Sequence, residues 1–257
     1  MRIVVKVGTS TLAHSTGRMN IRQVEELVKT LSDLKNAGHQ IILVSSGAIG
    51  MGVGKLPLNA RPSDVPTKQA AAAVGQCELM YTYDKLFTEY NHVVAQVLVT
   101  GTDFDCEQRR TNFMNTLCRL LDLDVLPIIN ENDSVATEEI LVGDNDTLSA
   151  MVAIYTGADL LILLSDIDGL YTADPHTCPN ARLIDTVIAI TPEIEELAGG
   201  KGSELATGGM QTKLRAAHMT TEQGIDMVIA NGSKAAVLYD ILAGKPVGTR
   251  FIGKQAN

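Results

Sequence analysis

The chain alternates short, unbroken apolar runs with longer segments in which apolar residues recur at helical spacing. The run 160–164 contains no polar residue, which is typical of a strand buried on both faces. In the segment that starts at Ile21, residues such as Val24 and Leu27 follow the period of an amphipathic helix. Buried strands that alternate with such helices predict an α/β fold, a three-layer αβα sandwich with a mostly parallel central sheet.

Strands and helices follow one another along the chain. Strands are predicted at 2–7, 40–44, 93–99, 125–130, 160–164 and 227–230, with a further short strand at 138–142. Helices are predicted from 21 to a stop at Gly38 and at 67–90, 105–121, 147–155, 210–223 and 235–242, with another beginning at 191–192. Asn20 and Gln23 form an N-cap pair for the first helix. The loop 54–66, which holds three prolines, is a candidate mobile lid.

The turns that follow the predicted strands carry most of the chemistry. In a parallel sheet with right-handed crossovers, all strand-to-helix turns lie at one edge. Four polar turns come directly after predicted strands, namely 6–8, 45–47, 130–133 and 165–166. The fold would bring these turns together, so we expect the functional site at that edge of the sheet.

The densest group of polar side chains lies in 130–133 and 142–146. These two turns carry four carboxylates and three amides. Such a group suits a small polar ligand that has an amine and a carboxylate, beside a metal and phosphates. Read alone, the same residues also fit two acidic surface loops, because Asn, Asp and Gly favour turns for local backbone reasons.

Three further turns contain residues that suit phosphate. Lys6 ends the first strand just before Gly8, so a fixed positive charge lies next to open backbone amides. The turn 46–50 has two glycines and the hydroxyl of Ser46, and 207–213 brings glycines and Lys213 to the start of a helix. Read alone, these features also have interpretations without a ligand. Lys6 could simply extend its ammonium group to water, and 207–213 could be a flexible hinge before an ordinary helix. Together, two lysines, glycine-rich turns and a carboxylate cluster favour phosphoryl transfer.

Several other kinds of protein are disfavoured. The phosphate loop GxxxxGK[ST] and the dinucleotide spacing GxGxxG are both missing. The four cysteines and five histidines lie singly, without the spacing of a zinc site or a nucleophilic triad. A net charge of −9 and the lack of Trp disfavour nucleic acid as a partner, and no apolar run is long enough to span a membrane. Because the N-terminus has no signal-peptide pattern, a cytoplasmic protein is expected.

Taken in order, seven motifs resemble those of the amino acid kinase family. They are VKVGTS at 5–10, SSGAI at 45–49, QAAAAVGQ at 69–76, INEND at 129–133, VGDND at 142–146, SDIDGLYTADP at 165–175 and TGGMQTK at 207–213. The ordered set is most similar to the family members that use ATP to phosphorylate the γ-carboxylate of L-glutamate. The resemblance implies the amino acid kinase fold, formation of L-glutamyl 5-phosphate and ADP, and the first step of proline biosynthesis.

The resemblance also implies residue roles. Lys6 and Lys213 would contact the ATP phosphates, and Asp146 would hold both lysines through ion pairs. L-glutamate would be bound by Ser46, Gly47, Asp133, Asp144 and Asn145. ATP would be bound by Lys6, Gly8, Ser165, Asp166, Thr207, Gly208, Gly209, Met210, Gln211, Thr212 and Lys213. Mg²⁺ would be bound mainly by phosphate oxygens, so no metal ligand is predicted on the protein.

The same resemblance concerns the whole chain. It implies a single amino acid kinase domain over 1–257, whose N-terminal part binds mainly glutamate and whose C-terminal part binds mainly ATP. A C-terminal PUA domain, a module similar to RNA-binding domains, is not expected. L-glutamate and ATP are the expected partners, proline is the expected feedback inhibitor, and a homo-oligomer is expected.

Two other functions stay open. A related kinase could act on acetylglutamate, aspartate, carbamate or a nucleoside monophosphate, although the carboxylates of 130–133 and 143–146 favour an unblocked amine. A sensor that binds an amino acid or a nucleotide without turnover could use the same fold. The presence of Lys6, Lys213 and Asp146 together favours catalysis.

Overall fold

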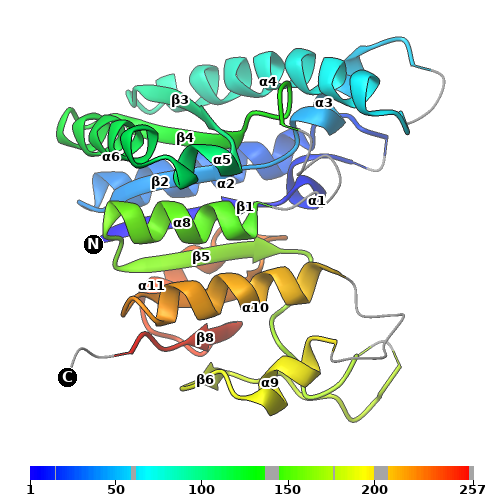
Figure 1. Cartoon of the computed structure of the whole chain (residues 1–257), viewed down its shortest axis with the longest axis vertical. Helices are drawn as coiled ribbons and strands as arrows, with labels where there is room; N and C mark the ends of the chain where they lie inside the picture. Colours follow the sequence, from blue (N-terminus) through cyan, green and yellow to red (C-terminus); the bar gives the residue numbers. More distant parts are fainter. Residues whose placement is uncertain (15, 59–61, 137–144, 176, 200–207, 255–257) are drawn as a thin grey trace.

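The computed structural model describes residues 1–14, 16–58, 62–136, 145–175, 177–199 and 208–254. Within these residues, eight strands form one sheet in the order β3-β4-β2-β1-β5-β7-β8-β6 (Figure 1). They are β1 (Arg2–Val7), β2 (Gln40–Ser45), β3 (Val94–Val99), β4 (Leu126–Glu131), β5 (Leu160–Ser165), β6 (Thr186–Val187), β7 (Asp226–Asn231) and β8 (Thr249–Phe251). Neighbouring strands pair in parallel except β7 and β8, which are antiparallel. The mostly parallel sheet expected from the sequence is confirmed.

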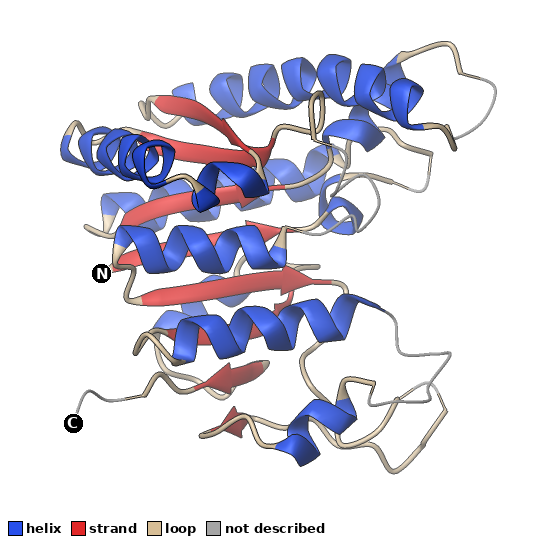
Figure 2. Ribbon diagram, in the orientation of Figure 1, coloured by secondary structure: helices blue, strands red, loops and turns tan. Residues whose placement is uncertain are grey.

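Helices cover both faces of this sheet (Figure 2). In the described ranges they are α1 (Thr9–Leu12), α2 (Ile21–Asn36), α3 (Ala48–Lys55), α4 (Val65–Thr88), α5 (Gly101–Asp105), α6 (Glu107–Asp122), α8 (Asp146–Thr156), α9 (Pro192–Leu197), α10 (Gly208–Thr221) and α11 (Val237–Leu242). One face packs against α6, α8 and α10, and the opposite face packs against α2, α4 and α11. This arrangement is the expected three-layer αβα sandwich.

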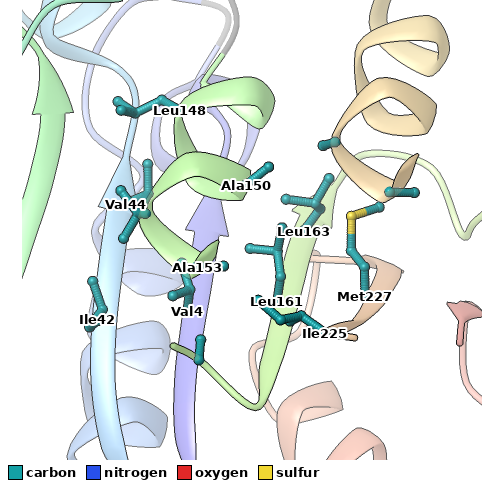
Figure 3. Close-up of a cluster of buried hydrophobic side chains, with 14 of the residues drawn as sticks. Val4, Ile42, Val44, Leu148, Ala150, Ala153, Leu161, Leu163, Ile225 and Met227 are labelled. Carbon is teal, nitrogen blue, oxygen red and sulfur yellow. The ribbon is translucent and has the colours of Figure 1, made fainter. Parts of the chain in front are cut away.

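Alternate strand residues point to opposite faces and build two separate cores. Val4 of β1 and Leu161 of β5 belong to the core beneath α8 and α10, part of which Figure 3 shows. Ile3 and Ile162, their neighbours in sequence, belong to the core on the other face, with α2 and α4. All four side chains are fully buried. Because both faces are covered, the central strands need the unbroken apolar runs seen in the sequence.

Local signals set the start of the two longest helices of the second layer. Asn20 caps α2 as predicted, since its side chain accepts a hydrogen bond from the backbone N–H of Gln23. Asp64 caps α4 in the same way, and Pro66 occupies the first turn, where its missing N–H costs no hydrogen bond. The cap at Asp64 explains why α4 begins two residues before the predicted start at 67.

Two glycines let α3 and α4 touch backbone to backbone. A Cβ atom on Gly52 would lie 1.8 Å from the carbonyl oxygen of Ala71, and one on Gly75 would lie 1.8 Å from that of Ala48. Any larger residue at either position would force the helices apart. α3 is therefore held firmly against α4 directly after the polar turn 45–47.

Parts of the sequence interpretation change. The segment 54–66 is not one open loop, because α3 extends to Lys55 and α4 begins at Val65. The sequence does not predict α1, β6 or β8, since four, two and three residues are too few to reveal a period. The strand predicted at 138–142 lies outside the described residues. Among those described, no helix is long and apolar enough to cross a membrane.

The parallel strands bring their carboxyl ends to one edge of the sheet. β1, β2, β4, β5 and β7 all end there, on the right in Figure 1, and α8 and α10 begin at the same edge. This is the edge where the sequence predicts the functional site.

Candidate functional site

Two lysines share one buried carboxylate at this edge. The Nζ atom of Lys6, on β1, lies 2.6 Å from Oδ1 of Asp146, and that of Lys213, on α10, lies 2.9 Å from Oδ2. Asp146 is completely buried, and both lysines are nearly so. Burial alone would raise the pKa of the Asp146 carboxyl, but the charges and hydrogen bonds of the two lysines outweigh burial and lower this pKa. Asp146 therefore stays ionised and holds both ammonium groups.

The starts of α8 and α10 assemble this cluster. Asp146 is the first residue of α8, where the helix dipole favours a carboxylate. Lys213 lies in the second turn of α10, later than the first turn expected from the sequence, and also donates to the carbonyl of Gly209 at 3.1 Å. The hydroxyl of Thr212 donates to Oδ2 of Asp146 at 3.1 Å. These contacts tie the two helix starts together.

A glycine stands beside each lysine. A Cβ atom on Gly8 would lie 3.9 Å from the Nζ atom of Lys6, and one on Gly209 would lie 3.9 Å from that of Lys213. Both distances are ordinary contacts, so each turn leaves room next to an ammonium group. Two fixed cations beside accessible backbone suit a polyphosphate.

The other described residues predicted to bind nucleotide lie around this cluster. Ser165 ends β5, which pairs with β1, and its hydroxyl donates to Asp166 at 3.1 Å. On α10, Met210 packs against the core, and Gln211 donates its side-chain amide to the carbonyl of Gly199 at 2.8 Å. Their contacts with a nucleotide stay predictions.

A network of neutral side chains, formed by Ser46, Asn130 and Asn145, lies next to Asp146. The amide nitrogen of Asn145 lies 3.0 Å from the hydroxyl of Ser46 and 3.2 Å from the carbonyl of Ser45. It also donates to Oδ1 of Asn130 at 2.9 Å. The Oδ1 atom of Asn145 is buried without a hydrogen-bond partner in the part of the chain that the structure describes. A buried acceptor of this kind suits a donor on a ligand.

Gly47 connects this network to α3. Its φ of 105° lies in the left-handed region, which glycine adopts without strain. As the residue before α3, Gly47 is followed by backbone N–H groups that have no partner within the helix. Such groups suit an anion, including a carboxylate.

Asp133 adds a carboxylate next to the network. Burial raises the pKa of this carboxyl to about 6, and no hydrogen bond or ion pair from the described residues offsets the effect. Asp133 lines a cavity of about 420 Å³ with Ala48 of α3, Gln76 of α4 and Glu131 of β4. A half-buried carboxylate without a cation among the described residues suits an ammonium group of a ligand.

The neutral network and the lysine cluster meet at consecutive residues. Asn145 belongs to the network, and Asp146 belongs to the cluster. A ligand held by the network and a ligand held by the lysines would therefore approach each other at the start of α8. This geometry suits a transfer between two bound molecules.

Comparison with known proteins identifies the family. The sequence pattern described as "Amino acid kinase family" matches residues 1–231. This chain belongs to the amino acid kinase family. A glutamate 5-kinase of Clostridium acetobutylicum is 55% identical over 253 residues, which cover 98% of this chain and 95% of the relative. That of Moorella thermoacetica is 53% identical over 254 residues, covering 99% of this chain and 67% of the relative.

Solved structures share the amino acid kinase fold at low sequence identity. Carbamate kinase from Giardia lamblia bound to AMP-PNP aligns with a TM-score of 0.69 and 19% identity, over 98% of each chain. An isopentenyl phosphate kinase aligns with a TM-score of 0.66 and 15% identity, over 98% of this chain and 100% of the other. At these identities the likeness concerns the fold alone.

Some site residues expected for this amino acid kinase stay untested, and others were missed. Asp144 and Thr207 lie outside the described residues. The sequence motifs imply no individual role for Asn130 or Gln76, although the side chain of Asn130 donates to Oε1 of Gln76 at 2.9 Å. One sequence signal could have pointed to Gln76, which directly follows the run of small apolar residues 70–75. A polar residue on a buried helix face needs a hydrogen-bond partner.

The described residues do not form a complete metal-binding site from their own side chains. No group of three or more His, Cys, Asp or Glu side chains that could hold a metal occurs among them. Both oxygens of Asp146 face lysines. The described residues are therefore compatible with a divalent cation that is bound mainly by the phosphates of the nucleotide.

Proposed function

We propose that this protein transfers the γ-phosphoryl group of ATP to the γ-carboxylate of L-glutamate. The products are L-glutamyl 5-phosphate and ADP, and the reaction is the first step of proline biosynthesis. The observation that carries the proposal is the meeting of the neutral network and the lysine cluster at Asn145 and Asp146. The choice of acceptor is supported by glutamate 5-kinases that match nearly the whole chain at 52% and 55% identity.

In this reaction an oxygen of the acceptor carboxylate attacks the γ-phosphorus of ATP. A bond forms between that oxygen and phosphorus, and the bond from phosphorus to the β–γ bridging oxygen breaks, which releases ADP. The carboxylate is already ionised at neutral pH, so no protein base has to remove a proton. Catalysis then depends on in-line positioning and on neutralising the negative charge of the transferred group.

We assign charge neutralisation to Lys6 and Lys213. Asp146 holds both ammonium groups before ATP binds, so neither has to reorganise during transfer. The remaining nucleotide contacts would come from the turn at Gly8, from 165–166 and from the start of α10. Mg²⁺ would be bound mainly by phosphate oxygens and would supply further positive charge there.

We assign recognition of L-glutamate to the neutral network and Asp133. The carboxylate of Asp133 suits the α-ammonium group, and the N–H groups after Gly47 suit a carboxylate. Asn145 and Ser46 would hydrogen-bond to polar atoms of the bound glutamate, and Asp144 would complete the pocket. An acid whose amine is blocked or missing would leave Asp133 half-buried without a cation, which favours free glutamate over N-acetylglutamate.

The proposal includes properties of the whole protein. The chain 1–257 would act as one domain, with glutamate bound by its N-terminal part and ATP by its C-terminal part. It would work in the cytoplasm as a homo-oligomer, which sedimentation at several concentrations tests. Proline carries an ammonium group and a carboxylate like those of glutamate, so it would compete for the same pocket. Unchanged activity at millimolar proline would contradict the proposed inhibition by proline.

Trapping of the product with hydroxylamine tests the proposed reaction. The purified protein is incubated with ATP, Mg²⁺, hydroxylamine and one of three acids, L-glutamate, N-acetylglutamate or L-aspartate. We expect a hydroxamate and an equal amount of ADP from L-glutamate only. Hydroxamate from another acid would keep phosphoryl transfer but overturn the assigned acceptor. Binding of both ligands without ADP release would make the protein a sensor.

A further inference from the structure

No residue of the motif 69–76 is assigned a role in the reaction proposed above, although Gln76 lines the cavity of Asp133. It lies on α4, where Gly75 brings the helix into contact with α3. Gln76, the next residue, is 9% exposed. A polar side chain buried to this extent is expected to serve a specific partner.

The partner of Gln76 is Asn130, at the end of β4. Oε1 of Gln76 accepts a hydrogen bond from Nδ2 of Asn130 at 2.9 Å. With Nδ2 directed toward α4, Oδ1 of Asn130 faces the site and accepts from the backbone N–H of Glu131 and from Nδ2 of Asn145, both at 2.9 Å. The same Nδ2 of Asn145 reaches the hydroxyl of Ser46 at 3.0 Å.

This order of donors and acceptors allows only one orientation of the Asn130 amide. If the amide were reversed, its NH₂ group would face the NH₂ group of Asn145, and two donors cannot share a hydrogen bond. Asn145 would then lose Asn130 as one of its three acceptors, which would disturb its contact with Ser46. Gln76 stabilises the observed orientation by giving Nδ2 of Asn130 an acceptor on the α4 side, in addition to the backbone N–H of Glu131 that donates to Oδ1.

We propose that Gln76 is a positioning residue for the acceptor site. It acts through Asn130 to fix the side chain of Asn145 and, with it, the contact to Ser46. The inference rests on the proposed function for the identity of the acceptor. The lysine cluster is independent of this chain of hydrogen bonds, since Asp146 is held by Lys6 and Lys213. Loss of Gln76 should therefore weaken acceptor binding and leave ATP binding unchanged.

The same helix offers a matched control. Tyr83, about two helical turns after Gln76, is fully buried, and its hydroxyl lies 2.9 Å from that of Ser45. Tyr83→Phe removes a buried polar contact between α4 and the same edge of the sheet. It does so without removing an atom that contacts the Asn130 amide.

Steady-state kinetics of Gln76→Leu, which removes the acceptor at similar volume, give the first test. We expect KM for L-glutamate to rise by about tenfold or more, while KM for ATP stays within about twofold. Tyr83→Phe should leave both KM values within about twofold of wild type. An equal rise of both KM values in Gln76→Leu, or the same rise for glutamate in Tyr83→Phe, would indicate a general loosening of α4 and overturn the proposal.

A measurement without turnover separates this inference from the proposed function. In protein labelled with ¹⁵N in its asparagine side chains, Gln76→Leu should shift the amide resonances of Asn130 and Asn145. Gln76→Glu retains an acceptor oxygen and should leave the Asn145 resonances near those of wild type. Unchanged Asn145 resonances in Gln76→Leu would overturn the positioning role whatever acid is phosphorylated. A wild-type protein that forms no hydroxamate from L-glutamate would overturn the proposed function alone.

Discussion

The site has a charged half and a neutral half. In the charged half, Lys6 and Lys213 each pair with Asp146, at 2.6 and 2.9 Å. In the neutral half, the amides of Asn130 and Asn145 hydrogen-bond to each other. Beside this network lies Asp133, and the pKa of its carboxyl is raised because burial is not offset by a described partner. Among the described residues, the charged half balances its charges before a ligand arrives, and the neutral half leaves the charge of Asp133 for the ligand to balance.

The difference corresponds to what each half is proposed to bind. Fixed cations next to the transferred phosphoryl group stabilise charge in the transition state, so the charged half should act on turnover. The neutral half would recognise the acceptor in its ground state, so it should act on KM. Substitutions in the two halves should therefore separate kcat from KM, and the pH dependence of their stability should have opposite signs.

The largest effect on stability is expected from Asp146→Asn. This change leaves two buried lysines without their carboxylate, which should lower the free energy of unfolding by about 3–5 kcal/mol at pH 7. The pKa of Asp146 is lowered in the folded protein, so its contribution is present above the pKa of an ordinary aspartate and is lost as pH falls through the lowered value. Urea unfolding should show that Asp146→Asn has a lower free energy of unfolding than wild type at pH 7. Below about pH 4 this difference should be smaller. A deficit that does not change with pH would contradict the paired state of Asp146.

The largest effect on turnover is expected from Lys6→Ala and Lys213→Ala. Each should lower kcat by about 10²- to 10³-fold, because a fixed cation is lost from the transition state, while KM for L-glutamate changes little. Lys245→Ala is the control, since Lys245 pairs with Asp240 at 2.6 Å on the surface. The hydroxamate assay measures all three. A kcat within about tenfold of wild type would remove that lysine from the catalytic assignment.

The packing of α3 against α4 supports the neutral half and gives a third prediction. In Gly52→Ala the new Cβ atom would meet the carbonyl oxygen of Ala71, which should lower the free energy of unfolding by about 1–3 kcal/mol. Gly50→Ala lies on the same helix and meets only the methyl group of Thr9, at 3.4 Å. It should be neutral or stabilise by up to about 1 kcal/mol through helix propensity. Equal unfolding midpoints for the two variants would show that the close contact of the helices adds nothing.

The fold could be predicted from the sequence because most elements have a clear period or cap. The continuous run of β5 and the Asn20 cap of α2 are signals within a few residues of chain. The short strand β8 carries no such signal, and its antiparallel pairing with β7 depends on where the chain returns to the sheet.

The site could be predicted only in part. Turns that follow parallel strands lie at one edge of the sheet, and this rule predicts that Lys6, Ser46 and Asp133 lie at the same edge. The roles of these residues stay predictions. The contact between Gln76 and Asn130 could not be predicted, because it joins positions 54 residues apart and depends on how α4 lies on the sheet. Which polar residues pair across helices is decided by tertiary packing, and sequence spacing does not record it.

The smallest and most diagnostic effect is expected at Asp133. Since its pKa is about 6, KM for L-glutamate should rise as pH falls through that value, because the protonated carboxyl no longer attracts an ammonium group. In Asp133→Asn this inflection should disappear, and KM at pH 8 should be raised about tenfold. Asp84→Asn, at an exposed position of α4, should show neither change.

The stability of the same variant tests the contrast between the two halves directly. A raised pKa means that the contribution of Asp133 to stability is present below the pKa of an ordinary aspartate and is lost as pH rises through about 6. Asp133→Asn should therefore be more stable than wild type at pH 8, by about 1–2 kcal/mol, and equal to it near pH 4. The sign is opposite to that of Asp146→Asn. If Asp133→Asn were less stable than wild type at pH 8, its carboxylate would already be paired in the free protein, and the two halves would not differ in how they handle charge.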